Sequence, residues 1–222
     1  MLFIGKILLG KIKMKNKFIT EYVTKQLNNL LPDGYIIENL DTYILKTINN
    51  LMFEKVRIWK ENPELEVLNS TKYPIFLYKL SRELYLNNEI KGATKIFYLN
   101  KILHSIDLFY EIDLKENFLL GHTIGSVFCK AQYGNYSIFW QNILVGVDKN
   151  KRPKLNDGLV MFPNSSIVGD CIVGKNVVIS ANTNIINENI PDNVIVFSNN
   201  NKLIFKKLNK FYAKKYFEIK ED

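Results

Sequence analysis

An aliphatic residue recurs every six positions along the second half of the chain. The members of this series are Leu155, Met161, Ile167, Val173, Ile179 and Ile185. Small or branched residues stand four positions further on, and Gly, Asn and Asp gather in between. Neither an α-helix nor an alternating β-strand has a period of six, whereas a triangular β-coil does, because each hexad supplies one flat strand and one corner. The series therefore predicts a parallel β-helix whose aliphatic residues point inward and stack between coils.

The same register is weaker but visible upstream, at Leu114, Leu120, Ile138 and Leu144. Between Leu144 and Leu155 the spacing is eleven residues rather than twelve, so the register slips inside "GVDKNKRPK". This stretch is polar and charged throughout. We therefore expect residues 147–154 to leave the coil as a loop.

The first half of the chain follows a helical period instead. Ile19, Val23 and Leu27 are spaced as on one helix face, and "PDG" at 32–34 ends that segment. Further helices are predicted over 41–59, around 77–84 and around 96–106. This half holds no catalytic motif, and His104, beside the last apolar face, is interpreted as a structural histidine.

The C-terminal segment "LIFKKLNKFYAKKYFEIK" mixes apolar residues with lysines. The spacing of Ile204, Leu208 and Phe211 predicts a basic amphipathic helix, which would cover the last coil. Docking on the protein is favoured over attachment to a membrane surface. The expected fold is thus α+β, with a helical region at 1–108, a β-helix at 109–197 and a C-terminal helix at 198–222.

The chain is basic, with a formal net charge of +8, which suits an anionic ligand such as nucleic acid, a membrane or a phosphate-bearing cofactor. We expect no nucleic-acid partner, because the chain has no recognised binding motif and no aromatic–basic platform. The apolar run "MLFIGKILLGKIKMKNK" is too short to span a bilayer, so at most a weak membrane-surface association is expected. Met14 is a second candidate for the first residue of the chain.

Cysteine usage bears on the cellular compartment. The two cysteines, Cys129 and Cys171, form neither a CxxC motif nor a disulfide framework. Together with the lack of a secretory signal, this favours a reducing cytoplasm. Hydrophobic residues make up 47% of the chain and charged residues 23%, which is typical of a globular protein with an ordinary core.

The hexads "VGKNVV", "ISANTN" and "IINENIP" follow a histidine on an earlier coil and a basic loop that contains proline. This combination resembles the serine acetyltransferase branch of the hexapeptide-repeat acyltransferases, over roughly residues 71–197. The resemblance implies a left-handed parallel β-helix and a homotrimer or a dimer of trimers. It also implies acetyl-CoA, bound with the acceptor between neighbouring subunits, and no metal ion.

The resemblance assigns a catalytic role to one residue. His122 in "LLGHTIG" takes the position of the family's catalytic histidine, although Gly121 replaces the aspartate that usually precedes it. In the family an acid just before the first coil orients that histidine. Glu111 and Asp113 are both candidates for this acid.

The basic loop also matches the family. "KNKRPKLNDG" falls on its Asp-Arg-His-Pro-Lys-Ile loop, with Lys151 and Arg152 in place of the arginine and the second histidine. Gly146 matches the glycine that opens the loop beside the thioester. Exposed lysine and arginine side chains can bind the phosphates of acetyl-CoA. The candidates are Lys149, Lys151, Arg152, Lys154 and Lys175.

These residues suggest one reaction and leave its acceptor open. An imidazole with a pKa near ~6.5 can remove a proton from an alcohol at neutral pH, so we expect direct transfer without an acetyl-enzyme. Because Gly121 and the loop depart from the residues that hold serine in the family, the expected acceptor is a hydroxyl of a sugar or glycan precursor. Serine O-acetylation for cysteine biosynthesis is the alternative. A non-catalytic β-helix scaffold or anion-binding protein is the alternative of another class, and an acyl group other than acetyl stays open.

Overall fold

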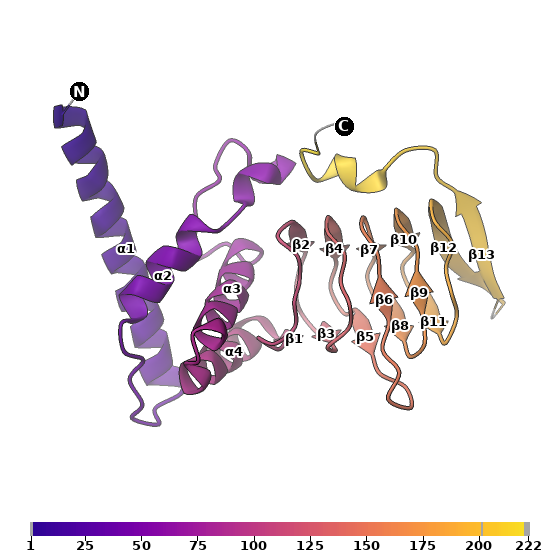
Figure 1. The fold of residues 1–222 in the computed structure, drawn as a ribbon, viewed down its shortest axis with the longest axis horizontal. Helices are drawn as coiled ribbons and strands as arrows, with labels where there is room; N and C mark the ends of the chain where they lie inside the picture. The colour runs from indigo at the N-terminus through magenta and orange to yellow at the C-terminus, as the bar shows by residue number, and fades with distance from the viewer. Residues whose placement is uncertain (1, 201, 220–222) are drawn as a thin grey trace.

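The computed structural model describes residues 2–200 and 202–219, with side chains from residue 16 onward. The molecule is elongated, with a helical region at one end and a β-helix at the other (Figure 1). The helical region contains α1 (Leu2–Leu30), α2 (Leu40–Asn49), α3 (Lys72–Leu86) and α4 (Ile90–His104). None of the helices in these ranges is both long enough and apolar enough to cross a bilayer. The N-terminal run and Met14 lie outside the described side chains.

The helix predicted over 41–59 is shorter than expected. After α2 the chain forms two short 3₁₀ helices, η1 (Phe53–Lys55) and η2 (Arg57–Trp59). Phe53, Val56 and Trp59 are each buried to at least 94%, and their spacing of three residues is the period of a 3₁₀ helix. A spacing of three also fits one face of an α-helix, so the sequence pattern did not distinguish the two.

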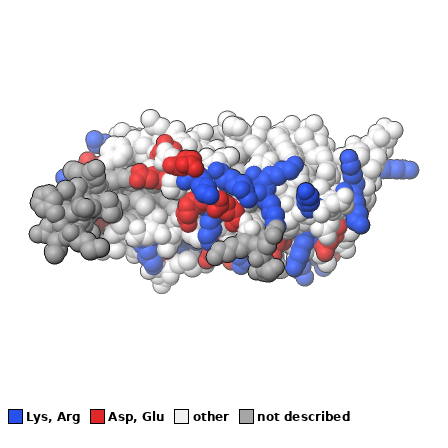
Figure 2. Space-filling model, turned by 90° about the horizontal axis from the view of Figure 1, so that it is seen from above, with Lys and Arg blue, Asp and Glu red and all other residues white. Residues whose placement is uncertain are grey.

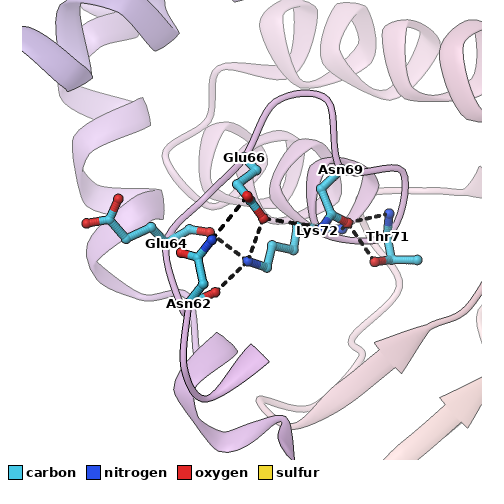
Figure 3. A network of polar contacts seen from close by, with 6 residues as sticks. All are labelled: Asn62, Glu64, Glu66, Asn69, Thr71 and Lys72. Carbon is cyan, nitrogen blue, oxygen red and sulfur yellow. Dashed lines mark hydrogen bonds and ion pairs between the residues drawn. The ribbon is translucent and has the colours of Figure 1, made fainter. Parts of the chain in front are cut away.

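A buried lysine anchors the loop that leads into α3. The Lys72 side chain is 1% exposed. Its Nζ donates hydrogen bonds to the carbonyl oxygens of Asn62 (2.6 Å) and Glu64 (3.0 Å) and to Oε2 of Glu66 (3.0 Å) (Figure 3). A buried ammonium is tolerated only when its donors are satisfied, as they are here. The loop is thereby fixed to the first turn of α3.

The β-helix has three faces, and each face is a stack of short parallel strands. The first face contains β1 (Asp107–Leu108), β3 (Val127–Phe128), β5 (Leu144–Gly146), β8 (Ser166–Val168) and β11 (Asn184–Ile186). The second face contains β2 (Phe118–Leu120), β4 (Ser137–Phe139), β7 (Val160–Met161), β10 (Val177–Ile179) and β12 (Val194–Asn199). The third face contains β6 (Lys154–Leu155) and β9 (Ile172–Val173). The strands make about five coils.

The period of six is confirmed by burial. All six aliphatic residues of the series from Leu155 to Ile185 are at most 1% exposed. On the first face, Val145, Ile167 and Ile185 are register partners in successive strands and form a continuous inward stack. At one edge, Asn142, Asn164 and Asn182 take positive φ values of 55–61°, which asparagine tolerates better than most residues. Their amides are hydrogen-bonded to one another along the axis, at 2.8 and 3.0 Å.

The C-terminal amphipathic helix predicted over 198–222 is wrong. Asn200, at φ 48°, turns the chain after β12. Residues Lys202–Lys207 then form β13, which pairs antiparallel with β12 and covers that edge of the second face. A short 3₁₀ helix, η3 (Tyr212–Lys215), follows. Backbone pairing with an available strand edge has replaced the helix that the apolar spacing suggested.

Residues 208–219 form what we call the C-terminal strap. This segment runs back along the coils from β13 to the helical region (Figure 1). Phe217 makes an antiparallel bridge with Val56, and the N–H of Arg57 donates to the carbonyl of Tyr216 at 2.8 Å. The strap therefore covers the second face and joins the last part of the chain to the segment before α3.

Candidate active site

His122 lies on an unusually long corner of the β-helix. Six residues, 121–126, join β2 to β3, whereas four residues join the corresponding strands in each of the next three coils. His122 has a φ of 52° and an exposed side chain. The two additional residues let the corner bulge outward, so the imidazole projects from the surface rather than packing inside.

Two hydrogen bonds tie this corner to the end of α4. The hydroxyl of Thr123 donates to the carbonyl of His104 at 3.0 Å, and the N–H of Gly125 donates to the carbonyl of Ser105 at 3.0 Å. The segment that carries His122 thus lies directly against the entry to β1. The helical region therefore takes part in holding the candidate base in place.

An aromatic stack runs along the coils beside His122. The imidazole centroid is 6.0 Å from that of Trp140, and Trp140 stacks on Phe162 with centroids 6.3 Å apart and planes at 9°. A Cβ atom at Gly121 would lie 2.6 Å from Cε3 of Trp140. Trp140 therefore occupies the space that a side chain at position 121 would need. The Trp140 ring and an aspartate at position 121 would therefore compete for the same space.

The two predicted orienting acids are engaged elsewhere. Glu111 forms an ion pair with Lys130, and Asp113 pairs with Arg82 and Lys115, both at 2.8 Å. Burial by itself would raise the pKa of Asp113, but the hydrogen bond from Lys115 and the charge of Arg82 lower it overall. Both acids follow β1 on the way to β2. Glu111 and Asp113 therefore lie at a corner that follows the first face, whereas His122 lies at the corner between the second face and the first face.

Asp107 is an acid next to that corner, and the predicted hexad series, which began at Leu114, did not include it. It opens β1 and is the register partner of Val127, five residues after His122, and its N–H donates to the carbonyl of Ser126 at 2.9 Å. Its carboxylate accepts a hydrogen bond from Lys101 at 2.6 Å. One further step of six back from Leu114 reaches Leu108, which is 1% exposed. Extending the hexad series by that step would have placed Asp107 on the first coil.

Residues 147–153 form the basic loop, which projects from the coils between β5 and β6 (Figure 1). Lys154, which was expected in the loop, begins β6. Asp148 and Lys151 exchange backbone hydrogen bonds, and the two residues between them have positive φ values. Lys149 and Lys151 line a cavity of about 570 Å³ at the base of the loop. Asp148 and Asp170 line the same cavity, and Lys151 Nζ lies 3.8 Å from Asp170. The predicted cations are thus partly balanced by acids.

The other predicted cofactor residues are spread over several parts of the coil. Gly146 ends β5 on the first face, where a Cβ atom would be 3.2 Å from a methyl of Val168. Burial raises the pKa of the Cys129 thiol, and the nearby charge of Arg152 lowers it. Arg152 therefore lies near Cys129. Cys129 follows β3, the strand that pairs with β5 and so lies one coil before Gly146. Lys154 is exposed on the third face, and Lys175 lies at the corner between β9 and β10, away from the loop.

Basic side chains are not evenly distributed over the molecule. On the side that carries the C-terminal strap, lysines and arginines gather over the middle and the β-helix end, while acidic side chains gather closer to the helices (Figure 2). Within the described ranges, no three His, Cys, Asp or Glu side chains lie together in a way that could hold a metal ion. The basic side chains in this view lie on the strap side, whereas the loop between β5 and β6 projects from the opposite side of the molecule (Figure 1).

His104, the second histidine, packs in the helical region. Its ring meets that of Tyr73 edge-on at 5.7 Å, and its Nε2 is buried without a hydrogen-bond partner among the described residues. Burial lowers the pKa of His104 to about 4, so this side chain is neutral at pH 7. These contacts agree with a structural histidine.

The chain thus consists of a helical region followed by a parallel β-helix of hexads. Among solved structures, serine acetyltransferases share this architecture. The enzyme from Brucella abortus matches with a TM-score of 0.60 and 16% identity, over 85% of this chain and 74% of its own. The enzyme from Neisseria gonorrhoeae, solved in complex with serine, matches with a TM-score of 0.57 and 18% identity, over 82% and 73%.

A serine acetyltransferase solved in complex with CoA is also similar, with a TM-score of 0.55 and 15% identity over 81% of this chain and 73% of its own. No protein-family model matches the chain, and no curated protein matches it. At these identities the likeness establishes the fold. The chain therefore has the fold of the serine acetyltransferases. The residues next to the candidate base His122 are Gly121 and Trp140.

Proposed function

We propose that the protein is an acetyl-CoA-dependent O-acetyltransferase that acts in the cytoplasm, with His122 as general base. The observation that carries the proposal is the long corner that presents an exposed imidazole on a serine acetyltransferase fold. A similar structure holds CoA, which supports acetyl-CoA as the donor. The basic loop at 147–153 supplies cations for its phosphates.

In the proposed reaction the imidazole of His122 removes the proton of an acceptor hydroxyl while that oxygen attacks the thioester carbonyl. The tetrahedral intermediate then collapses, the carbon–sulfur bond breaks, and the imidazolium returns its proton to the departing thiolate. Backbone N–H groups near Gly146 are suited to stabilise the oxyanion. The products are the acetyl ester and free CoA, without a covalent enzyme intermediate.

We favour Asp107 as the carboxylate that orients His122, ahead of Glu111 and Asp113. A carboxylate on the second ring nitrogen fixes the tautomer and stabilises the imidazolium. Asp107 enters the first coil where the His122 corner is hydrogen-bonded to the end of α4, whereas Glu111 and Asp113 lie beyond β1 on the way to β2. Lys101 donates a hydrogen bond to the Asp107 carboxylate at 2.6 Å, so this acid is held at the entry to the first coil.

L-Serine is the acceptor that the comparisons favour, because the similar structures are serine acetyltransferases and one is a complex with serine. A sugar hydroxyl is the second candidate, and a specific observation supports it. Trp140 leaves no room for an acid at position 121, so the wall next to His122 is aromatic where an acid could bind the ammonium of serine. Aromatic walls also suit the apolar faces of sugar rings.

The site is proposed to be completed by further copies of the chain. Val127, Leu144 and Ile186 point outward from the first face and are 42, 39 and 60% exposed. Val127 and Leu144 are register partners, and Ile186 lies two strands further on in the same sheet. Uncovered apolar residues on one sheet are typical of an interface. The strap already covers the second face, so the first face is where we place the subunit contact of a homotrimer.

Binding of CoA tests the donor assignment. We expect the double variant Lys149→Met with Lys151→Met to bind CoA about tenfold or more weakly than the wild type, because both lysines line the loop cavity. Isothermal titration calorimetry at two salt concentrations measures this loss. Lys206→Met with Lys207→Met, on exposed β13, is the matched control and keeps wild-type affinity. Absence of CoA binding by the wild type would favour a scaffold.

The packing of Gly121 against Trp140 yields a second prediction. Gly121→Asp is expected to lower the free energy of unfolding by about 1–3 kcal/mol, because its Cβ would overlap the indole ring. Adding Trp140→Ala removes the obstacle, so the double variant is expected to lose less stability than the sum of the two single variants. Urea unfolding of the four proteins measures the difference. Strictly additive losses would show that the two residues do not share one space.

A further inference from the structure

Half-buried aromatic rings connect His122 with the C-terminal strap. The imidazole lies beside Trp140, and the ring of Tyr216, from the strap, meets Trp140 edge-on at a centroid distance of 6.4 Å. The centroid of Tyr216 is 6.3 Å from that of Tyr212, and the Nζ of Lys215 lies 4.0 Å from the centroid of the Tyr212 ring. We call Trp140, Tyr216 and Tyr212 the aromatic row. It begins beside the candidate base and ends at a cation on the strap.

Contacts with the coils fix the part of the strap that carries these side chains. The Asn176 side chain accepts a hydrogen bond from the N–H of Tyr212 at 2.7 Å and donates one to the carbonyl of Lys210 at 3.1 Å. Between these two residues, Phe211 packs on Gly158, where a Cβ atom would lie 2.5 Å from the phenyl ring. A ligand would therefore meet a surface that is already ordered, which lowers the entropic cost of binding.

Positive charge is concentrated in the strap and in the strand before it. Residues 202–219 contain six lysines and one glutamate, which gives a net charge of +5 out of +8 for the whole chain. The glutamate, Glu218, forms an ion pair with Lys60 at 2.6 Å. The side chains of Lys210 and Lys215 are exposed. This surface therefore attracts an anionic ligand.

The strap and the basic loop lie on different sides of the molecule. The loop, which is proposed to bind CoA, projects away from the strap (Figure 1). His122 lies at the corner between the second face, which the strap covers, and the first face, where Gly146 ends β5. An acceptor on the strap side and a thioester on the first face would approach this corner from different directions. The arrangement leaves the strap side to the acceptor.

We propose that the acceptor is a chain of acidic sugar units, and that the strap with the aromatic row is its binding surface. The inference rests on the proposed acetyl transfer and selects the sugar acceptor over L-serine. Aromatic rings suit the apolar faces of sugar rings, and lysines such as Lys210 and Lys215 bind the carboxylates of an acidic glycan. Nucleic acids stack their bases on exposed ring faces, and the half-buried rings of the row suit them less well.

Calorimetry on the full chain tests this proposal with oligogalacturonate as the acidic glycan, a dextran oligosaccharide as the neutral one and a single-stranded oligonucleotide as the competing polyanion. At about 0.15 M salt, oligogalacturonate is expected to bind more tightly than either of the others. Lys210→Gln with Lys215→Gln is expected to weaken its binding about tenfold. Lys25→Gln with Lys91→Gln removes the same charge from exposed helix positions and should change it less than about twofold.

Tyr212→Leu separates a glycan surface from a general attraction between charges. This variant keeps the net charge but removes the ring, so oligogalacturonate should bind about fivefold more weakly. No binding by the wild type, or equal binding by the wild type and the Lys210–Lys215 double variant, would overturn the inference. Tighter binding of the oligonucleotide would overturn the choice of a glycan. Acetyl transfer to L-serine without oligogalacturonate binding would overturn this inference alone, whereas oligogalacturonate binding without acetyl transfer to any acceptor would contradict the proposed function.

Discussion

Replacing His122 with asparagine is expected to lower kcat/KM for acetyl transfer by about 10²–10⁴-fold, the usual contribution of a general base. Asparagine is the informative substitute because it tolerates the φ of 52° at this corner, so the backbone can stay as it is. The amide cannot accept a proton at neutral pH. A loss of activity in a folded His122→Asn protein would therefore report on the imidazole and not on the corner.

His104→Phe is the matched control for this experiment. His104 is neutral, its Nε2 has no hydrogen-bond partner among the described residues, and its ring packs on Tyr73, so a phenyl ring can replace it. We expect this variant to keep activity within a few-fold of the wild type. Steady-state kinetics on both variants, with circular dichroism to check the fold, separate the two histidines. Wild-type activity in His122→Asn would refute the proposed mechanism.

Phe217→Ala is expected to lower the free energy of unfolding by about 3–5 kcal/mol. The Phe217 side chain is fully buried where the strap meets the segment before α3, with its ring edge-on to Tyr136 at a centroid distance of 5.7 Å. Its loss leaves a cavity between the strap, the second face and the helical region. Urea unfolding followed by circular dichroism measures the change.

Phe205→Ala serves as the control in the same part of the chain. Phe205 lies on β13 and is 42% exposed, so its truncation should change the unfolding free energy by less than about 1 kcal/mol. Equal losses of unfolding free energy in the two variants would mean that the strap contributes no more to stability than the exposed strand β13 does. The predicted difference would show that the C-terminal segment joins the two halves of the molecule.

The β-helix was predictable because its signal is a period. Six inward residues from Leu155 to Ile185 recur at a spacing that other regular structures do not produce, and each of them is buried. The loop at 147–153 was predictable for the same reason, since a register slip marks where residues leave the coil. Periodicity depends only on local geometry, so one sequence is enough to detect it.

The C-terminal strap was not predictable in this way. The apolar spacing around Ile204 and Leu208 fits a helix, but β12 presents a free edge to which Lys202–Lys207 can pair. The strap then contacts Val56 and Arg57, more than 150 positions earlier in the chain. Contacts over such distances leave no trace in local patterns, so tertiary structure overrode the helical propensity.

The candidate site was predictable only in part. His122 stood out through the motif around it, whereas the acid that could orient it depends on which strand enters the first coil. The predicted hexad series began at Leu114 and therefore did not include Asp107. The buried Leu108, one hexad earlier, continues the series. Trp140 carried no signal at all, because its importance comes from the ring overlap that it would impose on residue 121.

The most direct test of the central claim is transfer of the acetyl group itself. Acetyl-CoA labelled in the acetyl group is incubated with the wild type or His122→Asn, and with L-serine, nucleotide-linked sugars or no acceptor. The proposed function predicts label on one hydroxyl acceptor, with equal release of free CoA, by the wild type only. Label on no acceptor despite CoA binding, or equal transfer by His122→Asn, would contradict it.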